Sequence, residues 1–134
     1  MNRLSFLALI FAVSTTLTSA TTKRVLIYYV GWNLETCVAL SAADVRRTAS
    51  VKTEITDGPV ADAFVRWLSE DKMAIEPKGK VNDLRLVIDA EQEDGSVWTY
   101  YADRYALFSV RSGKMRIISD SFRAHFSFFC EERG

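Results

Sequence analysis

The sequence predicts an α+β fold with a mixed or antiparallel sheet of about five strands, in the order β-α-β-α-β-β-β-α, and helices packed on it. Three observations lead to this prediction. In the first half, runs of β-branched and aromatic residues alternate with helix signals. In the second half, short strands follow one another across turn signals, which is typical of an antiparallel meander. A phenylalanine-rich helix pattern then follows the last strand.

The first twenty residues carry the pattern of a secretory signal peptide and are set aside from the fold. Arg3 precedes an apolar run from Leu4 to Val13, and small residues follow as far as Ala20. The run has about half of the roughly 20 residues that a membrane-spanning helix needs, although an uncleaved signal anchor is the alternative. We therefore expect residues 1–20 to be removed. Residues 21–134 should form a single α+β domain that is periplasmic or secreted.

The two cysteines, Cys37 and Cys130, lie near the two ends of the expected mature chain. Cysteines of exported proteins are usually paired, because the compartment is oxidising. A bridge between them would close almost the whole domain, and a loop of that length contributes roughly 4–5 kcal/mol in the chain-entropy model. We expect one disulfide to hold the fold together. Two buried free thiols or a reactive thiol are the alternatives, although the Cys-x-x-Cys pattern of redox proteins is absent.

The first predicted strand covers Lys23 to Trp32, a nearly continuous run of β-branched and aromatic residues. Such a run is typical of a central strand, and it could continue as far as Cys37 after a bulge. Ser41 then opens a shortened capping box with Asp44, so a helix should follow and end near Ala49.

The second strand and helix follow directly. Residues Val51 to Thr56 alternate between inward and outward side chains, as in a half-exposed strand. Asp57-Gly58-Pro59 predicts the start of a helix, because proline is tolerated in the first turn. Its apolar face carries four residues at helical spacing: Val60, Phe64, Trp67 and Leu68. The polar segment from Glu70 to Asp83 reads as a long loop.

The second half predicts a meander and a final helix. Its strand-like segments are Leu84–Ala90, Val97–Tyr101, Tyr105–Arg111 and Met115–Ser119. Asp94-Gly95 is a hairpin signal between the first two. Ser119 or Asp120 should cap the last helix. Its apolar face is formed by Phe122, Phe126 and Phe129, which should dock on the sheet.

Composition and motifs exclude several functions. The chain has 17 Lys and Arg against 17 Asp and Glu residues, so it lacks the basic excess that nucleic-acid binding usually needs. The single histidine, His125, is accompanied by no nucleophile motif such as Gly-x-Ser-x-Gly. One histidine and two paired cysteines also exclude the usual zinc sets. We therefore expect no nucleic-acid partner, no catalytic residue, no metal site and no cofactor.

The residues around the Asp94-Gly95 turn are the best candidates for binding a partner. Glu91, Glu93 and Asp94 gather acidic charge there, and Trp98 and Tyr101 follow closely. Trp and Tyr are enriched among the residues that dominate interface energies, and an acidic tip can dock on a basic surface. A solvated hairpin tip, a metal or catalytic site, and ordinary core packing of the aromatic residues are the alternatives.

These observations favour an exported protein-binding module, such as an inhibitor or an immunity-type protein, whose partner is another exported protein. The first alternative is a protein that binds a small ligand or an envelope component between sheet and helices. Four aromatic residues could line such a pocket: Tyr28, Trp32, Trp67 and Trp98. The second alternative is a small hydrolase-type enzyme, which would have to use His125 with Asp89 or Asp120.

Overall fold

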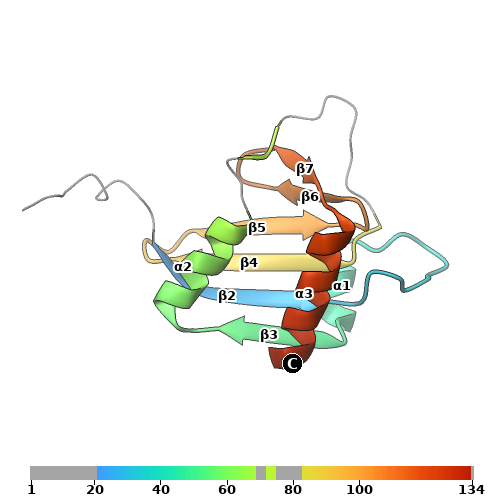
Figure 1. Ribbon diagram of the computed structural model, residues 1–134, viewed down its shortest axis with the longest axis horizontal. Coiled ribbons are helices and arrows are strands. Elements are labelled where there is room, and N and C mark those ends of the chain that lie inside the picture. Colours follow the sequence, from blue (N-terminus) through green and yellow to red (C-terminus); the bar gives the residue numbers. More distant parts are fainter. Residues whose placement is uncertain (1–20, 69–71, 75–82, 134) are drawn as a thin grey trace, which may run out of the picture.

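The computed structural model describes residues 21–68, 72–74 and 83–133, and for residues 128–133 it describes the helical backbone alone. This part of the chain forms an α+β fold with one antiparallel sheet of six strands and three helices (Figure 1). The predicted fold class is confirmed, with one strand more than the five expected. The predicted signal peptide and most of the predicted loop from Glu70 to Asp83 lie outside the described residues.

The sheet order is β3-β2-β4-β5-β6-β7. The strands are β2 (Thr22–Tyr29), β3 (Val51–Ile55), β4 (Leu86–Gln92), β5 (Val97–Ala102), β6 (Ala106–Ser109) and β7 (Met115–Ile117). The first two strands are antiparallel neighbours. The last four form the expected meander. Between these two groups, β2 pairs with β4 across a long separation in sequence.

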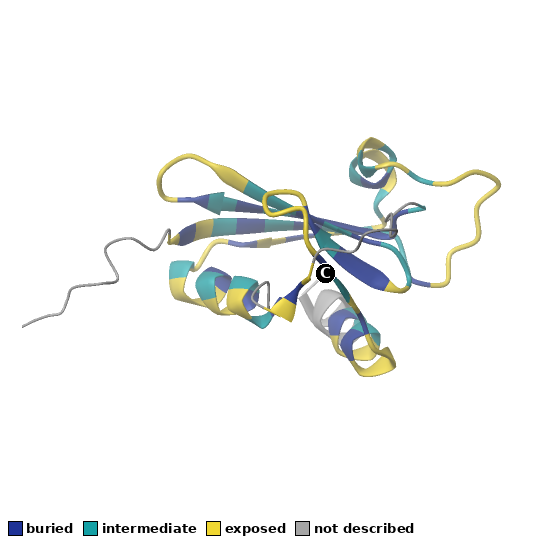
Figure 2. Cartoon of the chain, turned by 90° about the horizontal axis from the view of Figure 1, so that it is seen from above, coloured by how far each residue is buried: buried dark blue, intermediate teal, exposed yellow. Residues whose placement is uncertain are grey.

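The helices cover the two faces of the sheet unequally. They are α1 (Ala42–Thr48), α2 (Gly58–Trp67) and α3 (Asp120–Arg133). Figures 1 and 2 show α2 and α3 on one face and the short α1 alone on the other. We call the first the covered face and the second the open face.

Each helix begins where the sequence predicted it, because a side chain satisfies its first free backbone N–H groups. The predicted capping box of α1 is confirmed: Ser41 accepts from the N–H of Asp44, and the Asp44 carboxylate accepts from the N–H of Ser41. Asp57 accepts from the N–H of Val60 at the start of α2. Ser119 does the same for Phe122 in α3, at 3.0 Å.

The main core lies between the sheet and the two helices of the covered face. From the central strand β4, Leu86, Ile88 and Ala90 point into it and are fully buried. Phe122 and Phe126 of α3 pack on the same core, as their spacing predicted, and Phe126 is fully buried. Burial of one such side chain contributes roughly 1.5–3 kcal/mol. The third residue of the predicted face, Phe129, has no described side chain.

The first strand is shorter than the sequence predicted. It ends at Tyr29, and residues 31–41 form an irregular excursion instead of a continued strand to Cys37. Gly31 has a φ of 111°, and the N–H of Leu34 donates to its carbonyl, which closes a turn there. Only glycine adopts such a backbone angle readily, so this residue ends the strand and does not form a bulge within it.

Candidate functional site

Among the described helices, only α1 packs on the open face. The seven residues of α1 pack on β2 and β4 at one end, where Val45 is fully buried against Val87 and Leu84. Beyond α1, the outward side chains of the meander strands face away from the core. Because a strand alternates its side chains between two faces, every second residue of these strands belongs to this surface.

An apolar strip runs across the meander on the open face. We define it by five residues: Val97, Tyr101, Phe108, Val110 and Ile117. Tyr101 and Phe108 are directly opposite each other on β5 and β6, with ring centroids 6.4 Å apart. Three aliphatic side chains in the strip are strongly exposed, at 52% for Val97, 46% for Val110 and 74% for Ile117.

The register of the strands makes the strip continuous. Val110 is held beside β5 because its N–H donates to the carbonyl of Thr99 at 3.0 Å. It is therefore a diagonal neighbour of Val97, and Ile117 is in the same way a diagonal neighbour of Phe108. Scattered exposed apolar residues are common on any protein, whereas a contiguous row is typical of an interaction surface.

Charged side chains border the strip on the side of β2 and β4. Arg24 forms two hydrogen bonds to the carboxylate of Glu91, at 2.7 and 3.2 Å, and a third to Glu54 at 2.8 Å. Hydrogen bonding from Arg24 lowers the pKa of Glu91, and hydrogen bonding to Glu91 raises the pKa of Arg24. The three side chains form a charged cluster across β3, β2 and β4.

A second charged group ties α1 to the sheet. Arg46 of α1 donates to both carboxylate oxygens of Asp89, at 2.9 and 3.1 Å, and the hydroxyl of Thr99 donates to the same carboxylate at 2.8 Å. A two-point contact of this kind orients both groups. Asp89 is thereby engaged in fixing α1.

The structure separates the five residues predicted to bind a partner. Glu91 and Tyr101 lie on the open face, Glu91 within the cluster around Arg24 and Tyr101 within the apolar strip. Trp98 points to the covered face, where Arg111 stacks over its ring at 3.8 Å. At the exposed tip, Asp94 accepts from the N–H and the hydroxyl of Ser96, which lowers its pKa. Glu93 is exposed at the same tip.

Sequence reasoning missed four members of the strip, and it missed Arg24 at the border of the strip. Val97, Phe108, Val110 and Ile117 read as ordinary strand residues, because their shared face follows from the register of three strands. A signal was nevertheless present: Tyr100 and Tyr101 must point to opposite faces, so one of them had to leave the main core. The structure confirms this, with Tyr100 fully buried and Tyr101 on the open face.

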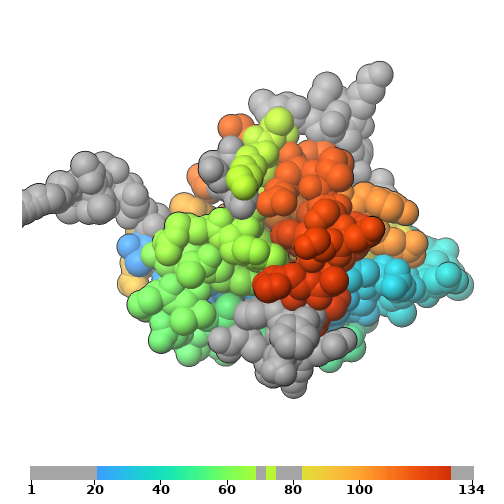
Figure 3. Space-filling model, viewed as in Figure 1, coloured from blue at the N-terminus to red at the C-terminus, as the bar shows by residue number. Residues whose placement is uncertain are grey.

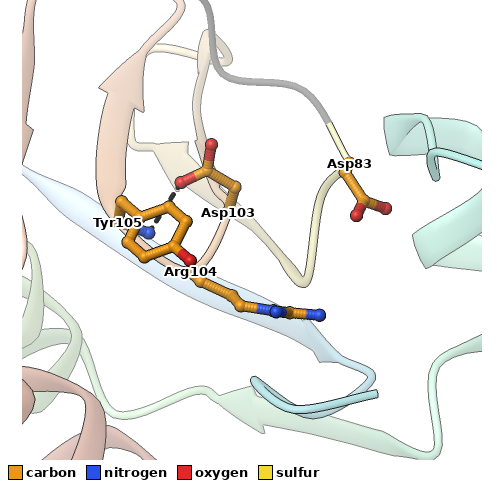
Figure 4. Close-up of a pocket in the computed structure, with 4 residues that line it drawn as sticks. All are labelled: Asp83, Asp103, Arg104 and Tyr105. Carbon is orange, nitrogen blue, oxygen red and sulfur yellow. Dashed lines mark hydrogen bonds between the residues drawn. The ribbon is translucent and has the colours of Figure 1, made fainter. Parts of the chain in front are cut away.

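A polar cleft of about 270 Å³ opens at one end of the sheet. Figure 4 shows the four side chains that line it: Asp83, Asp103, Arg104 and Tyr105. Asp103 is occupied by its own turn, since it accepts from the N–H groups of Tyr105 and Ala106. Among the described residues, the guanidinium of Arg104 makes a single long contact of 3.4 Å, to the carbonyl of Leu34.

The wall of this cleft is fixed by the buried side chain of Arg85. Its guanidinium donates to the carboxylate of Asp83 at 2.8 and 3.2 Å, and to the carbonyls of Leu84 and Leu34. The hydrogen bond from Arg85, helped by the backbone N–H of Leu40, lowers the pKa of Asp83. These bonds join the 31–41 excursion to the start of β4 and leave the cleft open beside them.

A smaller, apolar cleft of about 220 Å³ lies on the covered face, between α2 and α3. Figure 3 shows these two helices side by side on that face. Trp67 and Phe64 line the cleft from α2, and His125 lines it from α3 with its ring centroid 5.1 Å from that of Trp67. A third cavity, of about 320 Å³, lies beside Trp32, whose indole N–H donates to the carbonyl of Arg123. Of the four aromatic residues expected to line a pocket, Trp67 and Trp32 line these two cavities.

The residues considered for catalysis are kept apart. His125 lies on the covered face, whereas Asp89 lies on the open face in contact with Arg46. Asp120 pairs with Arg123 of its own helix. Among the described residues, no three His, Cys, Asp or Glu side chains are grouped closely enough to hold a metal ion.

The structure does not support the predicted disulfide. Cys37 is an exposed free thiol within the 31–41 excursion, and the side chain of Cys130 lies outside the described part of α3. Within the described ranges, no helix combines the length and the apolar character needed to cross a membrane.

Comparison with known proteins returns no relative from which a role could be transferred: no family model, no curated protein and no solved structure matches this chain.

Proposed function

We propose that this protein is an exported binding module that docks on another exported protein through the apolar strip of its open face. The observation that carries the proposal is the set of three exposed aliphatic side chains on β5, on β7 and directly after β6, which Tyr101 and Phe108 join into one apolar strip. An inhibitor or an immunity-type protein is the role that such a module would have.

The surroundings of the strip support a protein partner over a small ligand. The apolar centre is bordered by charged groups that are already oriented by one another, as Arg24 is by Glu91 and Glu54. Protein interfaces commonly combine an apolar, aromatic centre with a polar rim. A small ligand instead needs a concave site, and the cavities above lie elsewhere on the described surface.

The test begins with a partner captured from the exported fraction by a cross-linker placed at position 117, then identified and purified. Substitution of Ile117→Asp or Val97→Asp should weaken its binding at least tenfold, because a carboxylate would be forced into an apolar contact. The matched control is Val38→Asp, which introduces the same charge at a 70% exposed position of the 31–41 excursion. Equal binding by all three variants would rule out the strip as the contact surface.

The acidic hairpin tip is tested separately. Glu93→Lys reverses a charge at the tip without touching the cluster around Arg24. A fall in the association rate that disappears at high salt would show that the tip faces a basic surface of the partner. An unchanged rate would remove the tip from the interface and leave the strip as its centre.

The cleft between α2 and α3 favours a second candidate function, the binding of a small aromatic ligand. Its walls are apolar apart from His125, and Trp67 offers a ring surface for stacking. Titration with an aromatic carboxylate such as 1-naphthoate, followed by NMR, should shift the signals of the Trp67 indole and the His125 ring. Unshifted signals at both residues would contradict this candidate.

We also propose export, removal of residues 1–20, and oxidation of Cys37 with Cys130. Sequencing of the exported protein should give an amino terminus at Thr21, and a terminus at Met1 would contradict the cleavage. After export, Cys37 should resist thiol labelling until a reductant is added. Labelling without reductant would instead show the free, exposed thiol that the structure describes.

A further inference from the structure

The two edges of the sheet differ in how they are protected. At one edge, β7 is partly paired beyond the sheet, since Ala74 and Met115 exchange two backbone hydrogen bonds of 2.9 Å. At the other edge, β3 pairs with β2 alone among the described strands. An open edge is a template for another strand, and proteins either block it or use it.

Two residues of β3 direct their backbone N–H and C=O groups away from the sheet. The N–H of Val30 donates to the carbonyl of Arg85, on the side of β2 that faces β4. Backbone groups alternate between the two sides along a strand, so those of Ile27, three positions earlier, face β3. Ile27 pairs with Thr53. Thr53 therefore uses its backbone groups toward β2, whereas Lys52 and Glu54 direct theirs away from the sheet.

The side chains of β3 are complementary to those of β3 in a second copy of the protein, when the two strands run antiparallel. If two β3 strands run antiparallel and are centred on Thr53, Lys52 of each copy faces Glu54 of the other. Their outward backbone groups then form hydrogen-bonded pairs, and Val51 faces Ile55 on the covered face. Such an arrangement is isologous, as a two-fold dimer requires.

Thr53 supplies an independent observation. It is only 6% exposed, and its hydroxyl has no hydrogen-bond partner among the described residues. A buried hydroxyl without a partner is costly, and cross-strand threonine pairs form hydrogen bonds. In the reversed pairing, Thr53 is opposite its own copy at the closely spaced, non-hydrogen-bonded position, so that each hydroxyl meets the other.

We propose that two copies of this protein pair through β3, antiparallel and centred on Thr53, to form one continuous sheet across a two-fold axis. Lys52 is exposed and takes part in none of the described ion pairs, so its ammonium group is available to the partner's Glu54. Glu54 contacts Arg24 through one carboxylate oxygen, which leaves the other for Lys52. Since α3 crosses β3 (Figure 1), the two copies of this helix meet on one face of the dimer.

The charge pattern allows a strict test by sedimentation equilibrium of the purified protein over a range of concentrations. The protein should dimerise, and Lys52→Glu or Glu54→Lys should each weaken the dimer about tenfold, because like charges then face each other twice. The double exchange Lys52→Glu with Glu54→Lys should restore the original affinity. An equimolar mixture of the two single variants should form a heterodimer in which every pair is again complementary.

Two controls separate β3 from other contacts. Lys114→Glu and Glu93→Lys make the same charge changes at exposed positions outside β3, and both should leave the dimer unchanged. The proposal is overturned if the protein stays monomeric at all concentrations, or if the single variants dimerise as well as the original. It is also overturned if the mixed variants associate no better than each does alone.

Discussion

Arg85 is the largest fully buried side chain in the described part of the protein, at 1% exposure. Four groups accept hydrogen bonds from its guanidinium. They are the carboxylate of Asp83 and the carbonyls of Asp83, Leu84 and Leu34. A charged group is this deeply buried only when its surroundings replace its water. Arg85 therefore acts as the anchor of the 31–41 excursion.

Arg85→Ala should lower the free energy of unfolding by about 3 kcal/mol, because it leaves buried carbonyls without donors and removes the partner of Asp83. Urea denaturation measures this loss. Arg104→Ala is the matched control, since Arg104 makes a single long contact nearby, and it should cost less than about 1 kcal/mol. Equal losses in the two variants would show that Arg85 is not the anchor.

Asp83 should make the stability of the protein depend on pH. Its pKa is lowered in the folded state, chiefly by Arg85, so it stabilises the fold above the pKa of the unfolded chain. That contribution should disappear as the pH falls from about 4 through the lower folded pKa. The difference in stability between the protein and Asp83→Asn should therefore shrink between pH 7 and pH 2. A constant difference would contradict this account.

The burial of Arg85 could not be predicted from the sequence. Leu84 to Ala90 was predicted as an apolar strand, and Arg85 within it offered no sign of burial. Its partner carbonyl at Leu34 lies 51 positions away, so the contact exists only after the excursion has folded back. The cap residues Ser41, Asp57 and Ser119 were predictable because their partners are three positions away.

At the level of elements, α1 is the least self-sufficient helix. It has seven residues, and isolated helices of that length do not form in water. Its fold depends on the capping box, on buried Val45 and on the contact of Arg46 with Asp89. Its position decides how much of the open face stays accessible.

Ser41→Ala should destabilise the protein by about 1 kcal/mol, because the N–H of Asp44 loses its acceptor. Thermal or urea unfolding measures the change, and Thr56→Ala at an exposed position provides the control. If Ser41→Ala has no more effect than the control, the capping box does not stabilise α1.

The strands were largely predictable, and their ends were less so. The alternation of inward and outward side chains predicted β3, and the Asp94-Gly95 signal predicted the β4–β5 hairpin, in which Gly95 has a φ of 92°. The end of β2 was placed too late because Gly31 was read as a bulge. A strand end at glycine and a bulge at glycine have the same local sequence, and only the pairing of β4 with β2 as far as Tyr29 distinguishes them.

At the level of the whole molecule, the order of strands could not be predicted. It depends on β2 pairing with β4, and many residues separate these two strands in the sequence. The split of the predicted binding residues between two faces follows from that order and from the register within it. The separation of Trp98 from Tyr101 follows from the alternation of side chains along β5 alone.

The central strands should be the most stable part of the protein. Ile27 of β2 and Ile88 of β4 are fully buried opposite each other, with strands on both sides. Their amides should exchange hydrogen only by global unfolding, whereas the amides of β7 should exchange faster by local opening. Native-state hydrogen exchange measured by NMR tests this. Slower exchange in β7 than in β2 would contradict the expected hierarchy.

The central position of β2 also constrains how the chain can fold while it is being made. Of the described strands, β2 is completed first, yet one of its two neighbours, β4, ends at Gln92. Until ribosomal synthesis has passed that point, β2 and β3 form a two-stranded ribbon with an unsatisfied side, and such ribbons are marginally stable. The nascent chain should thus stay sensitive to proteases through most of its synthesis, and acquire resistance in one late step.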